Sequence, residues 1–246
     1  MKAILAGTLE TGRGTTQKNA TIFLDKGKIV DIAEGLDPKG ASEVLDASAF
    51  VVTPGLIDAH THIGTYCEGF PVGMADANDM VHPIAPQLRI LDAIYQDDTA
   101  FEDALAGGVT CVQTLPGSGN VIGGQGAIIK TSTSVHGRKK VVEEMLVRAP
   151  SSMKAALGEN PIRVYTEKGK LPNTRMGNAA LMRQALVDAE NYRNKQNQAK
   201  AKNEAGQGMR AMRGQTGELG LTAPERMAKM QKLMQERVEA MAGVHE

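Results

Sequence analysis

The chain has 246 residues, with 28 basic and 28 acidic side chains and therefore a formal net charge of zero. This balance points to no polyanionic or membrane-surface partner, and the two cysteines lack the spacing of a disulfide framework or a cysteine zinc site. No apolar run is long enough to cross a membrane and the apolar start is too short for a signal peptide, so a soluble cytoplasmic protein is expected.

The first segment, residues 1–53, is expected to form short strands of a small sheet. Two β-rich runs flank Lys26-Gly27-Lys28, which is a hairpin signal. Pro54-Gly55 then interrupts the extended pattern just before a new apolar strand. The sheet therefore precedes a larger unit.

That larger unit, residues 54–190, alternates strand-like and helix-like segments. Residues 83–108 are helical in pattern and end at Gly107-Gly108. Three buried strands are expected, "LIDAHTH" at 56–62, "VTCVQTLPG" at 109–117 and "GAIIKTSTS" at 126–134. Such alternation predicts an α/β fold with a parallel sheet, either a barrel or doubly wound.

The last segment, residues 191–246, is expected to be a polar linker followed by an amphipathic helix. A helix is predicted over 176–192, and the polar, repetitive stretch after it is typical of linker or disorder. Basic residues exceed acidic ones from 193 to 232, but aromatic rings for base stacking are missing there, so nucleic acid is not an expected partner. A capping box at Thr222 and Glu225 and a stop at Gly243 delimit the final helix. Its packing face is expected to consist of Met227, Met230, Met234, Val238 and Met241.

The most informative feature is the pair of histidines, His60 and His62, at the end of an apolar strand. Side chains alternate along a strand, so the two imidazoles share one face, which Asp58 joins. Neutral imidazoles on one face can converge on zinc or a similar cation, and a metal there would activate water and polarise a carbonyl. Two histidines at this spacing also occur by chance, so the pair alone leaves metal binding open.

The stretch "VVTPGLIDAHTHIG" at 51–64 resembles the first barrel strand of the amidohydrolase superfamily, whose signature is PGxIDxHxH. Residues 76–131, with their AGGVT strand and NVIGGQ loop, and residues 153–165, "MKAALGENPIRVY", resemble the imidazolonepropionase-like amidohydrolases. The resemblance covers roughly residues 1–190. It implies a partial TIM-type (β/α) barrel preceded by a small β-sandwich, with a C-terminal helical tail.

The resemblance also implies an activity, which is metal-dependent hydrolysis of a C–N bond, amide or cyclic amide, in a small-molecule substrate. His60 and His62 would be ligands of a divalent metal, with zinc expected, and Asp58 would support them. Some superfamily members bridge two metals with a carboxylated lysine on a later strand, which makes Lys130 a third candidate ligand. The substrate would meet Gly123, Gly124 and Gln125, although a tight turn that needs glycines explains that loop almost equally well.

Several parts of such a site have no counterpart in the sequence. Superfamily members add histidines from later strands and an aspartate general base from the last strand. After His62 the chain has only His82, His136 and His245, and none of them ends an apolar strand. No catalytic residue can therefore be assigned, and the length left for the barrel suffices for three or four βα units rather than eight.

The chain thus resembles the N-terminal half of an amidohydrolase joined to a helical tail, and three interpretations stay open. It could be a truncated product, one half of a split enzyme whose second chain completes the barrel, or a non-catalytic interaction or scaffold protein. A homo-oligomer is a further alternative, although a second copy would bring the same missing residues. The hydrolase interpretation predicts weak metal binding by the chain alone.

Overall fold

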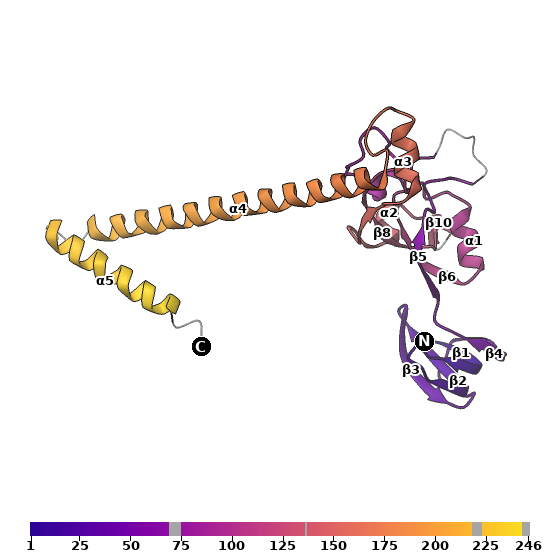
Figure 1. Cartoon of the computed structure of the whole chain (residues 1–246). Helices are drawn as coiled ribbons and strands as arrows, with labels where there is room; N and C mark the ends of the chain where they lie inside the picture. Colours follow the sequence, from indigo (N-terminus) through magenta and orange to yellow (C-terminus); the bar gives the residue numbers. More distant parts are fainter. Residues whose placement is uncertain (69–74, 136, 218–222, 243–246) are drawn as a thin grey trace. The chain divides into compact units, whose positions relative to one another are not determined.

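The computed structural model describes residues 1–68, 75–135, 137–217 and 223–242. The chain forms two compact units, Met1–Met182 and Arg183–Glu246. All described strands belong to the first unit, whereas the described residues of the second are helical (Figure 1). No described helix combines the length and the apolar character needed to cross a membrane.

The N-terminal strands form one four-stranded sheet in the order β3-β2-β1-β4. β1 is antiparallel to β2, β2 to β3, and β4 lies parallel to β1. Lys26 and Gly27 both have positive φ, 48° and 76°, as a two-residue hairpin turn requires. The predicted hairpin is therefore confirmed, and the strands are β1 (Lys2–Glu10), β2 (Thr16–Asp25), β3 (Lys28–Glu34) and β4 (Glu43–Val52).

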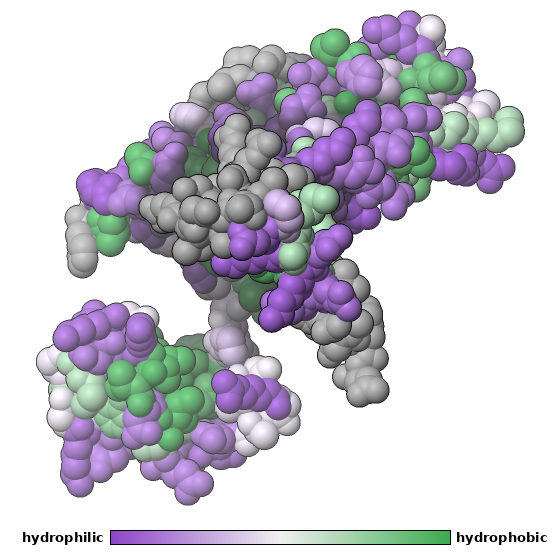
Figure 2. All heavy atoms as spheres, turned by 90° about the vertical axis from the view of Figure 1, so that its left-hand side faces the viewer, coloured by the Kyte–Doolittle hydropathy of each residue, from purple (hydrophilic) through white to green (hydrophobic). Residues whose placement is uncertain are grey.

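This sheet buries only the middle of its apolar face. Ile32, Ile22, Ile4 and Leu45 form a row across all four strands. Ile22 is 5% exposed, but Ile32 and Leu45 at the two ends are 39% and 61% exposed. Figure 2 shows apolar atoms gathered on one face of the lower body, which is this sheet. The described residues thus supply one sheet where a β-sandwich has two.

The second four-stranded sheet has the order β11-β8-β6-β5. β5 (Leu56–Thr61) and β6 (Val109–Thr114) are parallel, and α1 (Ala100–Ala106) lies in the connection between them, as a parallel crossover requires. β8 (Ala127–Lys130) is antiparallel to β6, and β11 (Leu146–Arg148) is antiparallel to β8. The α/β class is confirmed, whereas no sheet of the described residues closes into a barrel.

A compact core packs against the β6–β8 part of this sheet. Phe101 of α1, Val112 of β6 and Ile129 of β8 are fully buried in one cluster with Met145. Burial of a side chain of this size stabilises a fold by about 1.5–3 kcal/mol. The core therefore fixes β6, and with it the parallel neighbour β5 that carries the histidine pair.

The other elements of the first unit are short. β7 and β12 form a separate two-stranded antiparallel sheet, and β9 and β10 form another. The bounds are η1 (Ile90–Ala93), β7 (Ile122–Gln125), β9 (Ser134–Val135), β10 (Arg138–Lys139), α2 (Val142–Met145), β12 (Met153–Ala155) and α3 (Glu159–Thr166). The two strands of the β7–β12 sheet therefore come from separate parts of the chain, since β7 precedes β8 and β12 follows β11.

The C-terminal part differs from the prediction. α4 (Arg175–Gly217) is one helix of 43 residues, so the segment predicted as an irregular linker is helical, and the expected boundary at 190 lies inside α4. Alanine and straight-chain polar residues dominate this segment, and these residue types favour helix. α5 (Ala223–Ala242) follows, with Met227, Met230 and Met234 exposed. The predicted helix ends Thr222 and Gly243 lie outside the described residues.

Candidate metal centre

The two predicted ligands, His60 and His62, lie together at the carboxyl end of β5. His60 is in the strand and His62 follows its last residue, Thr61. The ladder with β6 shifts register between Asp58 and Thr61, and the Asp58 carboxylate accepts a hydrogen bond from the His60 backbone N–H at 3.0 Å. Such irregularities re-aim side chains. The imidazole centroids are 5.6 Å apart with the ring planes nearly perpendicular, at 83°.

A backbone carbonyl next to the neighbouring strand constrains the tautomer of His62. Its Nδ1 lies 2.8 Å from the carbonyl oxygen of Leu115, just beyond β6. Because a carbonyl can only accept, this contact places a proton on Nδ1, and in the neutral ring Nε2 then keeps its lone pair. Metal-binding histidines are held in this way by a hydrogen bond from the other ring nitrogen. The ring of Tyr66 packs edge-on against His62, with centroids 5.7 Å apart.

A buried carboxylate organises the loop that follows His62. Asp98, 2% exposed, accepts hydrogen bonds from the backbone N–H groups of Gly64 at 2.8 Å, Glu68 at 3.1 Å and Ala100 at 3.2 Å. One side chain therefore ties the start of α1 to the loop behind the histidines. The sequence prediction missed Asp98, because nothing local distinguishes it from the adjacent Asp97.

Lys154 is a second residue that the sequence prediction missed, and it contacts a histidine directly. Its Nζ lies 3.2 Å from Nε2 of His60, and the residue is only 8% exposed. Burial lowers the pKa of its amine below the ordinary lysine value. Lys154 belongs to β12, within the stretch that resembles imidazolonepropionase-like enzymes, and this resemblance was the only available signal.

Lys130, the lysine predicted as a ligand, lies at the other end of the sheet. It pairs with Cys111, which pairs in turn with Ile57, whereas the site end of β6 pairs Thr114 with Thr61. Three residues along β6 correspond to about 10 Å. Lys130 is also exposed, so the structure does not bring it to the histidines.

The predicted substrate loop is a strand, β7, whose glycines admit close neighbours. A Cβ on Gly124, which has a φ of +120°, would lie 2.6 Å from the carbonyl oxygen of Leu88. A Cβ on Gly123 would lie 3.5 Å from the side chain of Lys154. The two glycines therefore let β7 pack tightly against its neighbours, Leu88 and Lys154. That Gly123 and Gly124 contact the substrate stays a prediction.

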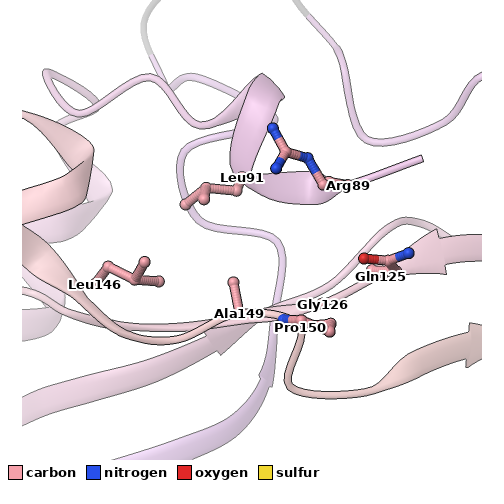
Figure 3. A pocket seen from close by; sticks show the side chains of 7 residues that line it. All are labelled: Arg89, Leu91, Gln125, Gly126, Leu146, Ala149 and Pro150. Atoms are coloured by element: carbon pink, nitrogen blue, oxygen red, sulfur yellow. The ribbon is translucent and has the colours of Figure 1, made fainter. Parts of the chain in front are cut away.

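Gln125, the third predicted substrate residue, has its side chain at a cavity that neither His60 nor His62 lines. Its side-chain amide donates to the carbonyl of Pro86 at 3.1 Å. It lines a cavity of about 240 Å³ with Arg89 nearby and Leu146 on the opposite side (Figure 3). The Arg89 guanidinium is already paired with Asp92, with Nε 3.0 Å from a carboxylate oxygen. The remaining lining residues are Leu91, Gly126, Ala149 and Pro150, and neither histidine is among them.

The remaining histidines do not extend the centre. His82 is exposed in a loop and its Nδ1 lies 2.8 Å from the carbonyl oxygen of Ile84. His136 and His245 lie outside the described residues. Within the ranges that the structure describes, no three histidine, cysteine or carboxylate side chains lie close enough to hold a metal ion. The available donors are therefore two imidazoles and the Lys154 amine.

Known proteins with a similar sequence or structure include two amidohydrolases and an allantoinase. No family model matches the chain. Amidohydrolase tasK from Hapsidospora irregularis is 30% identical over 176 residues, which cover 68% of this chain and 18% of that protein. An allantoinase from Escherichia coli (strain K12 / DH10B) is 42% identical over 69 residues, covering 23% and 15%. The crystal structure of an amidohydrolase from Thermotoga maritima MSB8 matches with a TM-score of 0.75 and 35% identity, covering 82% of this chain and 51% of that one.

Fold and site together define an α/β protein in which a parallel strand pair presents two histidines at its carboxyl end. The chain belongs to the amidohydrolase superfamily. It spans about half the length of the solved relative and less than a fifth of the two curated relatives.

Proposed function

We propose that this chain carries part of the active centre of a metal-dependent hydrolase that cleaves a C–N bond, amide or cyclic amide, in a small molecule. The observation that carries the proposal is the convergence of His60, His62 and Lys154 from β5 and β12. The names of the relatives, amidohydrolase and allantoinase, support the reaction class.

The donor set suits a divalent transition metal, with zinc as the expected one. His62 has a free Nε2 lone pair because its Nδ1 is engaged with Leu115, and Nε2 of His60 faces a buried amine rather than a carboxylate. Catalytic zinc sites use three protein ligands and keep one position open. A metal held here would supply Lewis-acid polarisation of the amide carbonyl and would lower the pKa of water.

Lys154 takes the place that the sequence prediction gave to Lys130. Its burial favours the uncharged amine, which can attack carbon dioxide. The lysine nitrogen forms a bond to carbon, one C=O π bond breaks, and the amine loses a proton to solvent. The resulting carbamate places an anionic carboxylate beside His60, and this converts two neutral imidazoles into a site with a charged third ligand.

A second candidate function, binding of another polypeptide, is favoured by β5 itself. Among the described strands β5 has a neighbour on one side only, and its Leu56 and Ile57 are 57% and 72% exposed. An open strand edge with apolar side chains is a template for an added strand. A second chain that completes the fold, or a second copy, would use this edge.

The test of the metal proposal is the metal content of purified protein, measured by mass spectrometry after incubation with zinc and gel filtration. We expect about one zinc per chain in the native protein, as a single catalytic-type site would hold. The variant His60→Ala/His62→Ala should hold none. Native protein without zinc, or a double variant that retains it, would contradict the proposal.

A further inference from the structure

Gln113 of β6 links the two strands that form the His60–Lys154 contact. Its side-chain amide donates to the hydroxyl oxygens of Ser152 at 2.6 Å and Ser151 at 3.1 Å. Its backbone carbonyl accepts a hydrogen bond from the Thr61 hydroxyl at 3.3 Å. Thr61 directly follows His60, and Ser152 lies two residues before Lys154. Gln113 therefore bonds to the residue after His60 and to a residue close to Lys154.

This link matters because His60 and Lys154 belong to different sheets. β5 and β6 lie in the four-stranded sheet, whereas β12 pairs only with β7 among the described strands. Residues two apart on extended chain share a face, so Ser152 and Lys154 point to the same side, one toward Gln113 and the other toward His60. The hydrogen bonds of Gln113 thus connect the two sheets next to the point where His60 and Lys154 meet.

The backbone around this link is closely packed. Ser152 and Ser151 also exchange backbone hydrogen bonds with Gly126, at 2.9 Å each. A Cβ on Gly126 would lie 2.7 Å from the Ser152 hydroxyl and 2.6 Å from the side chain of Leu115. The serine hydroxyls therefore have little room to adopt another position while Gln113 holds them.

We propose that Gln113 is the positioning residue of this centre, because it keeps Lys154 beside His60 and so determines whether the lysine can serve as third ligand. The link to metal binding rests on the proposed function, whereas the positioning of Lys154 does not. Gln113 would act through Ser152, so removal of either partner of this hydrogen bond should have the same consequence.

The experiment uses the full chain and four variants, Gln113→Leu, Ser152→Ala, the combination of both, and Lys154→Met. The ring ¹⁵N shift of His60, recorded by NMR in chelator-treated protein, reports the contact without metal. We expect Gln113→Leu and Ser152→Ala to move this signal toward its position in Lys154→Met, and the combination to move it no further. Gln184→Leu, which removes an exposed glutamine of α4 that bonds Asp188, serves as the control.

The same proteins are then titrated with zinc against a chromogenic chelator. Gln113→Leu and Ser152→Ala should each bind zinc about 10–100-fold more weakly than the native chain, as removal of supporting groups around a metal usually does. An unchanged His60 signal in Gln113→Leu would overturn the positioning role. A shifted signal with no zinc bound by the native protein would uphold the positioning role and reject the metal function instead.

Discussion

Lys130 and Lys154 lie near opposite ends of the sheet formed by β5, β6 and β8, and the two lysines differ in exposure and in their contacts. At the far end, Lys130 is exposed and pairs across the ladder with Cys111. At the site end, Lys154 is 8% exposed and its amine faces an imidazole at 3.2 Å. The comparison teaches that register and burial, rather than residence on a strand, decide which lysine can become a ligand.

Two glycines with positive φ, Gly124 near Lys154 and Gly108 at the far end, also differ in the packing around them. Near Lys154, Gly124 is so close to Leu88 that a Cβ would reach its carbonyl oxygen. At the far end, Gly108 accepts the hydrogen bond from Leu56 N and also has a positive φ, +83°, but a Cβ there would meet nothing within 4 Å. The Gly124 position is therefore less tolerant of a side chain than the Gly108 position, and substitutions can test this difference.

The largest difference is expected between Gly124→Ala and Gly108→Ala. Alanine at Gly124 combines backbone strain with a clash, for a loss of about 2–5 kcal/mol in the free energy of unfolding. Alanine at Gly108 adds only the strain of positive φ, about 1–2 kcal/mol. Urea unfolding followed by circular dichroism measures both losses. Equal losses at the two glycines would show that the close approach of Leu88 to Gly124 adds nothing to the strain of a positive φ.

The second comparison pairs Lys154→Met with Lys130→Met in zinc binding. Lys154→Met should weaken the zinc affinity by about 10–100-fold, because the third donor is lost from the centre. Lys130→Met should leave the affinity unchanged, since Lys130 lies at the far end of the sheet. Competition with a chromogenic chelator measures both values. If Lys130→Met weakens zinc binding and Lys154→Met does not, Lys130 is the lysine ligand, as the sequence predicted.

The third prediction concerns Tyr165, which braces the loop between β6 and β7. Its hydroxyl donates to the Asn120 side-chain oxygen at 2.7 Å, and Asn120 donates to the carbonyl of Asp79 at 2.7 Å. Tyr165→Phe leaves the buried Asn120 oxygen without this partner and should cost about 1–2 kcal/mol at neutral pH.

The pH dependence of this variant has a definite sign. Burial, and secondarily Asp79, raises the pKa of Tyr165 from 10.0 to about 12. The unfolded chain loses the phenolic proton first, so native stability should fall between pH 10 and 12, and the Phe variant should lack this fall. Urea unfolding at pH 8 and pH 11 measures the difference. If the native chain exceeds Tyr165→Phe in free energy of unfolding by the same amount at pH 11 as at pH 8, the pKa of Tyr165 is not raised by burial.

Local patterns predicted the histidine pair, because every signal for it lies within residues 51–64. Lys154 could not be found in that way, since its contact with His60 spans 94 residues of sequence and depends on how two sheets meet. The helix predicted over 176–192 is the first part of α4, whereas its continuation over 193–217 was missed for a different reason. Its polar composition is shared by disordered segments and by exposed helices, and composition alone does not separate the two. A strand was predicted over 126–134 and β8 lies within it, but its antiparallel direction was not predicted, because the alternation of strands and helices suggested a parallel sheet.

The smallest expected effect concerns the pH dependence of stability that Lys154 causes in metal-free protein. Because burial lowers the pKa of this amine from 10.5, the folded chain releases the proton at a lower pH than the unfolded chain does. Between those two values the unfolded state holds more protons, so native stability should rise with pH and level off above 10.5. Lys154→Met removes this dependence.

The measurement is the free energy of unfolding of the native chain minus that of Lys154→Met, from pH 8 to pH 10.5 with a chelator present. The range begins above the usual titration of histidine, and the titration of Tyr165 cancels because both proteins contain it. The difference should become more favourable to the native chain as pH rises. A flat difference would mean that the amine keeps its charge in the fold, and the site end would then hold a protonated lysine that cannot react with carbon dioxide.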